Sequence, residues 1–163
     1  MKPLALYLRR ALLCAAACVP LWIGAVPIES GAAWPMLELS DQHDKPVRIS
    51  PAIRLVIFAA EKPASDLVIR VLGAQGRNTL ERTGAVYLAD ISAMPSIVTR
   101  MFALPKLRGL PFPVGLAREA AAVADLPRRP GAATVLTLKD GQVTQVQYAQ
   151  TEAELRQALG LAL

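Results

Sequence analysis

The sequence predicts an α/β fold in which buried strands alternate with helices. Two runs, Ile53–Ala59 and Ala85–Ile91, are apolar apart from Arg54 and Asp90 and have the composition of strands that are buried on both faces. Apolar residues at helical spacing follow each run. With 53% hydrophobic and 19% charged residues, the chain of 163 residues is too apolar to be disordered. One globular core is therefore expected.

The N-terminal part of the predicted domain is a β-hairpin. Met36–Leu39 and Val47–Ile49 have the pattern of short strands. Between them, Asp41–Pro46 is dense in residues that form turns. Ser50-Pro51 then breaks the second strand, and the central strand Ile53–Ala59 follows.

Two helices are predicted after the central strands. The first follows a turn at Lys62–Ser65 and takes Ser65 as its cap. Its expected buried positions are Leu67, Val68, Val71 and Leu72. The second begins at Pro95, which suits a first helical turn, and stops or kinks at Pro105. Its expected buried side consists of Ile97, Val98, Met101, Phe102 and Leu104. The polar stretch Asn78–Thr83 is predicted as a connection.

The last third of the chain predicts two strands and a helix. Thr134–Leu138 and Val143–Tyr148 flank Asp140-Gly141, a dipeptide typical of hairpin turns. Thr151 and Glu154 have the spacing of a capping box, which opens a C-terminal helix. Upstream, the sequence predicts a short strand and a short helix, at Phe112–Leu116 and Arg118–Ala124.

Residues 1–33 have the layout of a secretory signal peptide. Basic residues precede the apolar stretch Ala11–Val26, and the small residues Ser30–Ala33 offer cleavage sites. We place cleavage near Ala33, so that the domain spans residues 34–163 in the periplasm. The alternative is an uncleaved inner-membrane anchor, because Ala11–Ile28 is 18 residues long and mostly apolar. Two prolines interrupt that stretch, which favours the signal peptide.

Both cysteines, Cys14 and Cys18, lie inside this N-terminal segment. A lipoprotein signal at Cys18 is disfavoured, because Ala15 stands where a larger aliphatic residue is expected. The predicted mature domain therefore has neither a structural disulfide nor a thiol that could cycle. It carries 15 basic and 12 acidic residues, and the basic ones are scattered. This charge distribution argues against nucleic-acid binding.

Three stretches carry a resemblance to the thioredoxin-like superfamily, and in particular to its exported thiol-disulfide oxidoreductases and peroxiredoxins. The sequence LELSDQHDKPVRI resembles their opening hairpin, LVIFAAEKPASD their strand and active-site turn, and ATVLTLKDGQV their closing hairpin. The order of elements is also similar over the whole predicted domain. The resemblance implies a three-layer sandwich with a mixed central sheet, flanking helices and an N-terminal β-hairpin.

The resemblance also implies that the redox site has changed. Lys62 takes the place of the first cysteine of the family's Cys-x-x-Cys motif, and Ser65 takes the place of the second. Neither side chain can exchange a disulfide, which requires a thiolate. The family's cis-proline falls at Ala133. We therefore expect no catalytic residue and a binding surface formed by Glu61, Lys62, Pro63, Ser65 and Ala133.

Other chemistry is sparsely indicated. His43 lies between Asp41 and Asp44, where a weak cation contact is conceivable, but one histidine in a solvated turn makes a poor metal site. Asp90, at the end of its strand, suits either a site carboxylate or a cap for the helix at Pro95. Lys62 beside Glu61 suits either an anion contact or a surface ion pair. No metal or bound cofactor is predicted.

The leading hypothesis is an exported, redox-inactive thioredoxin-like domain that binds an envelope protein or a small ligand. The alternative is a thioredoxin-like oxidoreductase that uses a bound cofactor, such as a flavin, or the thiols of a partner. A third hypothesis is an accessory subunit tethered to the membrane by an uncleaved N-terminal segment. Membrane contact is expected only in that case.

Overall fold

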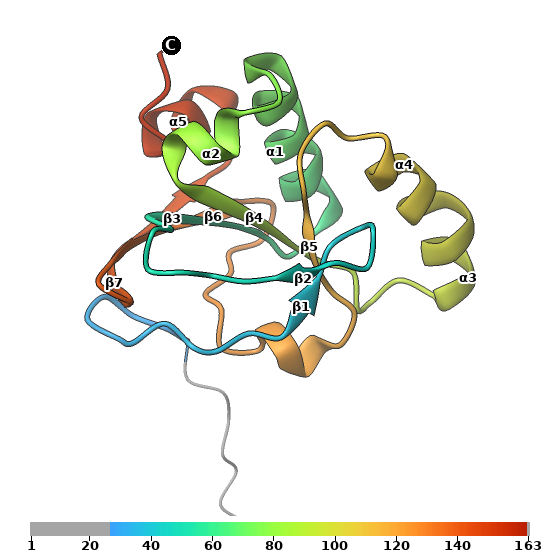
Figure 1. Cartoon of the computed structure of the whole chain (residues 1–163), viewed down its shortest axis with the longest axis horizontal. Helices are drawn as coiled ribbons and strands as arrows, with labels where there is room; N and C mark the ends of the chain where they lie inside the picture. Colours follow the sequence, from blue (N-terminus) through green and yellow to red (C-terminus); the bar gives the residue numbers. More distant parts are fainter. Residues whose placement is uncertain (1–26, 163) are drawn as a thin grey trace, which may run out of the picture.

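The computed structural model describes residues 27–162, which form a seven-stranded sheet in the order β2-β1-β5-β4-β3-β6-β7 (Figure 1). The strands are β1 (Leu39–Ser40), β2 (Pro46–Val47), β3 (Leu55–Ala59), β4 (Ala85–Asp90), β5 (Gly115–Ala117), β6 (Ala133–Lys139) and β7 (Gln142–Ala149). Strand β4 runs parallel to β3 and β5, whereas β6 runs antiparallel to β3 and β7. The predicted mixed sheet and its N-terminal hairpin β1–β2 are confirmed.

The helical elements are α1 (Lys62–Gln75), α2 (Thr79–Thr83), α3 (Ser96–Val98), the π-helical turn η1 (Thr99–Ala103), α4 (Leu104–Arg108), the 3₁₀ turn η2 (Ala120–Val123) and α5 (Glu152–Ala158). Helices α1, α2 and α5 cover one face of the sheet (Figure 1). On the other face lie η2 and the chain from Ile28 to Leu37. The fold is therefore α/β, with a covered sheet at its centre.

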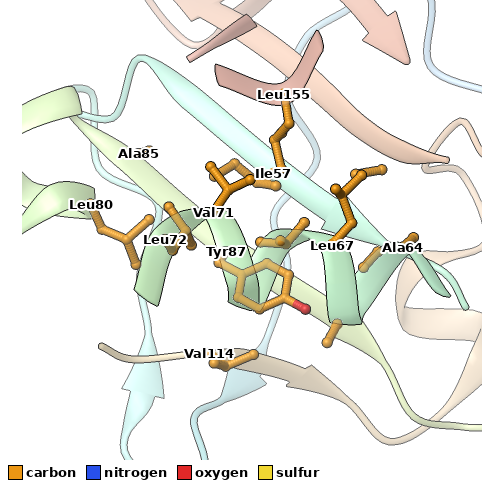
Figure 2. Packing of buried hydrophobic residues seen from close by; sticks show 14 of the residues in the cluster. Ile57, Ala64, Leu67, Val71, Leu72, Leu80, Ala85, Tyr87, Val114 and Leu155 are labelled. Carbon is orange, nitrogen blue, oxygen red and sulfur yellow. The ribbon is translucent and has the colours of Figure 1, made fainter. Parts of the chain in front are cut away.

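Strand β3 is central because both of its faces are buried. Ile57 points into the core beneath α1, where it meets Leu67 and Val71 (Figure 2). Its neighbours Val56 and Phe58 point to the opposite face. Full burial of such side chains contributes about 1.5–3 kcal/mol each. Because alternate side chains of β3 enter different cores, this one strand stabilises the packing on both faces of the sheet.

Helix α1 starts earlier than predicted. Glu61 is its extended N-cap residue, with φ −140° and ψ 160°, and Lys62–Ser65 forms the first helical turn instead of a preceding loop. Pro63 suits this turn because proline at the start of a helix sacrifices no intrahelical hydrogen bond. The predicted cap at Ser65 is therefore wrong. The helix ends at Gly76, whose φ of 92° favours glycine.

The polar connection Asn78–Thr83 contains a helix that was not predicted. Helix α2 spans Thr79–Thr83, buries Leu80 and ends at Gly84, which has a left-handed φ of 61°. A five-residue helix with one buried leucine is too short to show an apolar period in the sequence. Helices of this length are not stable alone, so packing on the rest of the domain stabilises it.

The second predicted helix is divided into three parts, and the prediction of its buried side is wrong. Helix α3, the π-helical turn η1 and α4 follow one another without a break from Ser96 to Arg108, and Pro105 lies in the first turn of α4. The large side chains expected to be buried are instead exposed: Ile97, Val98, Met101 and Phe102. Within residues 27–162, no element lies over that side of the segment.

The closing hairpin and the C-terminal helix are confirmed. Asp140 and Gly141 both have positive φ, 52° and 76°, as a two-residue turn between β6 and β7 requires. Thr151 and Glu154 make the capping box that opens α5. Upstream, the predicted helix 118–124 contains only the 3₁₀ turn η2.

The chain just before Trp34 packs on the domain. The amide of Ile28 donates to Asp125 O at 2.8 Å, and that of Gly31 to Val143 O at 2.7 Å. The amide of Trp34 donates to Gly141 O at 2.8 Å. Ile28 itself is buried. The basic and apolar parts of the predicted signal peptide lie outside the described residues.

None of the helices formed by residues 27–162 combines the length and the apolar character that crossing a bilayer requires. The predicted anchor, Ala11–Ile28, lies outside the described residues except for its last two positions.

Candidate functional site

The start of α1 is held by two charged side chains. Glu61 accepts a hydrogen bond at 3.1 Å from the amide of Gly131, in the loop before β6. Lys62 pairs with Asp66 one turn along the helix, and Lys106 of α4 lies 3.9 Å from the same carboxylate. Of the two possibilities for Lys62, a surface pair with Glu61 does not form, and the contacts of both residues tie α1 to two other segments.

Ser65 lies on the inner side of this turn and contacts Tyr87 of β4. Its hydroxyl is 2.8 Å from the Tyr87 phenol, which is fully buried (Figure 2). Burial raises the pKa of Tyr87 well above its usual value, and the hydrogen bond with Ser65 opposes this only in part. A phenol that stays protonated cannot accept the serine proton. This pair therefore anchors α1 to the sheet and does not activate a nucleophile.

The remaining predicted binding residues lie at different depths. Pro63 is exposed beside Lys62. Ala133 is fully buried and pairs with Ala59 of β3 and Ala149 of β7, so it offers no surface to a ligand. Every peptide bond within residues 27–162 is trans. The structure thus brings Glu61, Lys62, Pro63 and Ser65 together and places Ala133 behind them.

A groove of about 320 Å³ opens beside this turn, between α1 and the segment 94–107. We call it the α1–α4 groove. The α1 side contributes Lys62, Ser65, Asp66 and Ile69; the end of β4 contributes Ala89, Asp90 and Ile91; the helical segment contributes Met94, Val98, Phe102, Ala103, Lys106 and Leu107. Most of this surface is apolar. Its charged groups are Glu61, Lys62 and Asp66 at the start of α1, Asp90 at the end of β4, and Lys106 on α4. Such a lining suits an apolar ligand with a polar end.

Asp90 lies in the wall of the groove, but its oxygens are occupied. Oδ1 accepts from the amide of Ser92 at 3.0 Å and from its hydroxyl at 2.6 Å. Oδ2 lies 3.3 Å from Nη1 of Arg128, whose guanidinium stacks over Phe58. Asp90 does not cap α3, which begins after Pro95. Its contacts indicate a structural role at the end of β4.

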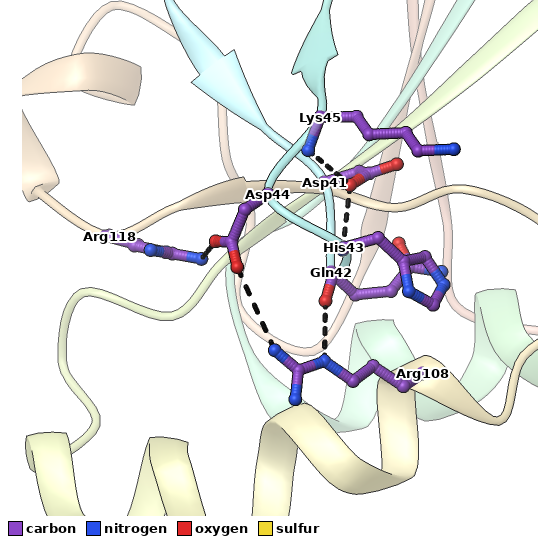
Figure 3. A network of polar contacts seen from close by, with 7 residues as sticks. All are labelled: Asp41, Gln42, His43, Asp44, Lys45, Arg108 and Arg118. Carbon is purple, nitrogen blue, oxygen red and sulfur yellow. Dashed lines mark hydrogen bonds and ion pairs between the residues drawn. The ribbon is translucent and has the colours of Figure 1, made fainter.

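The turn that contains His43 is organised by the side-chain carboxylate of Asp41 (Figure 3). Asp41 Oδ1 accepts from the amides of His43 and Lys45, at 2.7 and 2.9 Å. Asp44 pairs with Arg118 at 2.6 Å, and this hydrogen bond holds the pKa of Asp44 below its usual value. Within residues 27–162, no three side chains of the metal-binding types cluster together.

Gln42, in the same turn, fixes the far end of α4. Its amide donates to Phe112 O at 2.9 Å and accepts from the Val114 amide at 2.8 Å. The backbone carbonyl of Gln42 accepts a hydrogen bond from Arg108 Nε at 2.9 Å (Figure 3). Gln42 is buried, so these bonds are shielded from water. The N-terminal hairpin thereby positions the helical segment that forms one wall of the groove.

A second hollow, of about 370 Å³, lies on the other side of the sheet around Trp34, Ile49 and Ile53. The indole Nε1 of Trp34 is buried and has no hydrogen-bond partner within the described residues. None of the predicted binding residues contributes to this hollow.

Solved structures with the same arrangement of elements identify the fold. The peroxidoxin BcpB from Mycobacterium tuberculosis aligns with a TM-score of 0.54 at 17% identity, over 82% of this chain and 95% of that one. A putative protein disulfide isomerase from Bacteroides thetaiotaomicron aligns with a TM-score of 0.55 at 14% identity, over 82% and 87%. The chain has a thioredoxin-like fold. A putative thioredoxin from Neisseria meningitidis is similar at 18% identity, with a TM-score of 0.53 over 81% and 89%.

No protein-family model and no curated protein matches the chain. At these sequence identities, the similarity between this chain and the solved thioredoxin-like structures concerns the fold alone. What the site does must therefore be argued from its own side chains.

The α1–α4 groove was missed by the sequence reasoning. It depends on the exposure of Val98 and Phe102, which helical spacing assigned to the core. One signal was available in the sequence: Ser92–Ala117 contains no acidic residue and several large apolar ones, an unusual composition for a helix on a protein surface.

Proposed function

We propose that this thioredoxin-like protein is an exported, redox-inactive binding protein of the bacterial cell envelope. Its ligand, an envelope protein or a small molecule, occupies the α1–α4 groove. One observation carries the proposal: the first turn of α1 presents Lys62 and Ser65 where the family resemblance implies two cysteines, and this turn opens onto an apolar groove.

The chemistry of the turn supports redox inactivity. Lys62 is paired with Asp66, and Ser65 is hydrogen-bonded to a buried phenol. Thiol-disulfide exchange requires a thiolate that attacks sulfur, and neither residue provides one. Cys14 and Cys18 lie in the N-terminal segment that export would remove.

The lining of the groove supports ligand binding. Ile69 and Phe102 supply apolar contact from opposite walls, and Lys62 stands at the positive end of α1. A ligand with an apolar body and a carboxylate would use both features. Lys106, on the facing wall, lies near the same rim and adds a second cation.

Export is supported by the N-terminal sequence, and the packing before Trp34 favours cleavage upstream of Ile28. A cut near Ala33 would remove the buried Ile28 and its backbone hydrogen bond to Asp125. Intact mass of the protein recovered from the periplasm is expected to place the new N-terminus between Ala25 and Ile28. Full-length protein in the membrane fraction would contradict this part of the proposal.

The redox part is tested with purified protein in insulin-reduction and peroxide-consumption assays, where no turnover above background is expected. Thiol-dependent turnover by protein lacking residues 1–26 would contradict it. A flavin absorption band in protein purified from its natural host would favour the cofactor-dependent oxidoreductase instead.

Binding is tested with an anilinonaphthalenesulfonate dye, which combines aromatic rings with an anion. Ala103→Phe fills the groove and Lys62→Glu replaces one of its two cations with an anion, so each is expected to weaken dye binding by about threefold or more. Arg77→Glu is the matched control, because Arg77 is exposed and lies beyond the far end of α1. Equal affinity of all four proteins would place the binding surface elsewhere.

A further inference from the structure

The segment from α3 to α4 is apolar on both of its sides. Leu107 is buried, and Met94 and Leu104 pack against the same core. On the outer side, Ile97 and Met101 are 69% and 64% exposed. A helix that is apolar all round is normally buried on all sides, so the outer side of this segment lacks the cover that its composition predicts.

The same segment carries positive charge only. From Ser92 to Ala117 the sequence has no aspartate or glutamate, while it has Arg100, Lys106 and Arg108. Acidic side chains from other elements face two of these cations: Asp66 lies near Lys106, and Asp44 lies near Arg108. Arg100, between Ile97 and Met101 in the sequence, makes no ion pair within residues 27–162.

The charge indicates what covers this surface. A second copy of the chain would place a second Arg100 in the same interface without a carboxylate to face it, and like charges in contact are unfavourable. The segment lies at the outer edge of the molecule, where its helices project beyond the sheet (Figure 1). Projecting apolar side chains flanked by basic residues are typical of protein segments that lie in the headgroup region of an anionic bilayer.

We propose that the surface of Ile97, Arg100 and Met101 docks on a membrane that contains anionic lipids. Ile97 and Met101 enter the boundary between headgroups and acyl chains, and Arg100 contacts lipid phosphates. This contact differs from ligand binding in the α1–α4 groove, because neither apolar residue lines that groove. It also requires no part of residues 1–26.

The first test places a fluorescent reporter on this surface in the full chain. Met101→Trp keeps a large apolar side chain, and its emission is expected to move to shorter wavelength with phosphatidylglycerol vesicles but not with phosphatidylcholine vesicles. Arg77→Trp is the control, since it lies beyond the far end of α1, and its emission is expected to stay unchanged. Both reporter variants carry Trp22→Phe and Trp34→Phe, so that the introduced indole is the only one in the chain. Attachment through the N-terminal segment alone would therefore not shift the emission.

The second test measures partition between water and phosphatidylglycerol vesicles. Ile97→Ser combined with Met101→Ser is expected to lower the partition coefficient of the mature protein at least about tenfold, because two apolar side chains that would enter the bilayer are lost. Added salt is expected to weaken binding of the parent protein. An unshifted reporter, or equal shifts with both lipids, would overturn the proposal and leave the surface to a protein partner.

Discussion

Helix α1 and the α3–α4 segment occupy equivalent positions after parallel strands, yet they treat their apolar residues in opposite ways. Helix α1 follows β3 and buries Leu67, Val71 and Leu72 against the sheet. The segment after β4 keeps Leu107 inside but exposes Ile97 and Phe102. The difference shows that helical periodicity identifies an apolar face without identifying what will cover it.

The cause lies in the neighbours of each helix. Helix α1 lies over the sheet and beside α5, so its inner face meets two layers of apolar side chains. The α3–α4 segment lies at the edge of the sheet, where only one side meets the core (Figure 1). Its second apolar face is therefore available for binding.

The largest expected effect compares one leucine of α1 with one aromatic residue of the segment. Leu72→Ala removes a fully buried side chain and is expected to lower the free energy of unfolding by about 2–5 kcal/mol, because a cavity remains. Phe102→Ala removes a larger side chain that is 67% exposed, and is expected to change stability by less than about 0.5 kcal/mol.

Urea unfolding of the two variants measures this difference. A cost for Phe102→Ala as large as that for Leu72→Ala would contradict the comparison, because the exposed face would then have to be covered within the fold. Val98, which is also exposed, provides a second substitution on the same side.

The second prediction concerns the tie between the N-terminal hairpin and the segment. Gln42→Leu leaves Phe112 O and Val114 N without their partner, so the expected loss of stability is about 2–3 kcal/mol. The end of α4 is expected to loosen with it. Faster hydrogen exchange of amides between Arg108 and Val114, with α1 unchanged, would check this point.

Global loss of protection in the Gln42→Leu variant, in α1 as much as in α4, would contradict the idea that Gln42 acts locally. Lys45→Ala is a suitable control, because the side chain of Lys45 is exposed and only its backbone amide is used in the turn.

The sequence predicted those elements whose determinants are local. The Asp140-Gly141 turn and the capping box of Thr151 depend on residues within four positions of one another, and both are confirmed. Strands β3 and β4 were predicted because full burial leaves a continuous apolar run. The start of α1 was misplaced by four residues, because Pro63 and Ser65 both fit more than one position of a helix start.

The candidate site was only partly predictable. Ser65 meets Tyr87 across 22 residues of sequence, and Gln42 meets Phe112 across 70, so neither contact has a local signal. The position of the turn was predicted from the family resemblance. The groove beside it was not, because it requires Val98 and Phe102 to face away from the core.

The third prediction concerns the anchor of α1. Tyr87→Phe removes the hydrogen bond with Ser65 and is expected to cost about 1 kcal/mol at neutral pH. Burial holds the pKa of Tyr87 above its unfolded value of 10.0, so the unfolded state loses this proton first as the pH rises. Stability from Tyr87 is thus fully present below pH 10 and declines above it.

Denaturant unfolding at neutral and alkaline pH tests both effects. The parent protein is expected to lose more stability between the two conditions than Tyr87→Phe, which has no proton to lose at that site. Parallel losses in both proteins would mean that Tyr87 ionises as readily in the folded state as in the unfolded one.

The smallest expected effect concerns Lys62, where the family resemblance implies the first cysteine. Its ion pair with Asp66 is exposed, and such pairs contribute little because water screens them. Lys62→Glu loses this pair and places two carboxylates one helical turn apart, but it also puts a negative charge at the positive end of α1, which is favourable. The opposing effects are expected to keep the change in unfolding free energy within about 1 kcal/mol. Thermal and urea unfolding of Lys62→Glu, with Arg77→Glu as the control, measure this change. A larger loss would mean that Lys62 contributes mainly to the stability of α1 and not to binding in the groove.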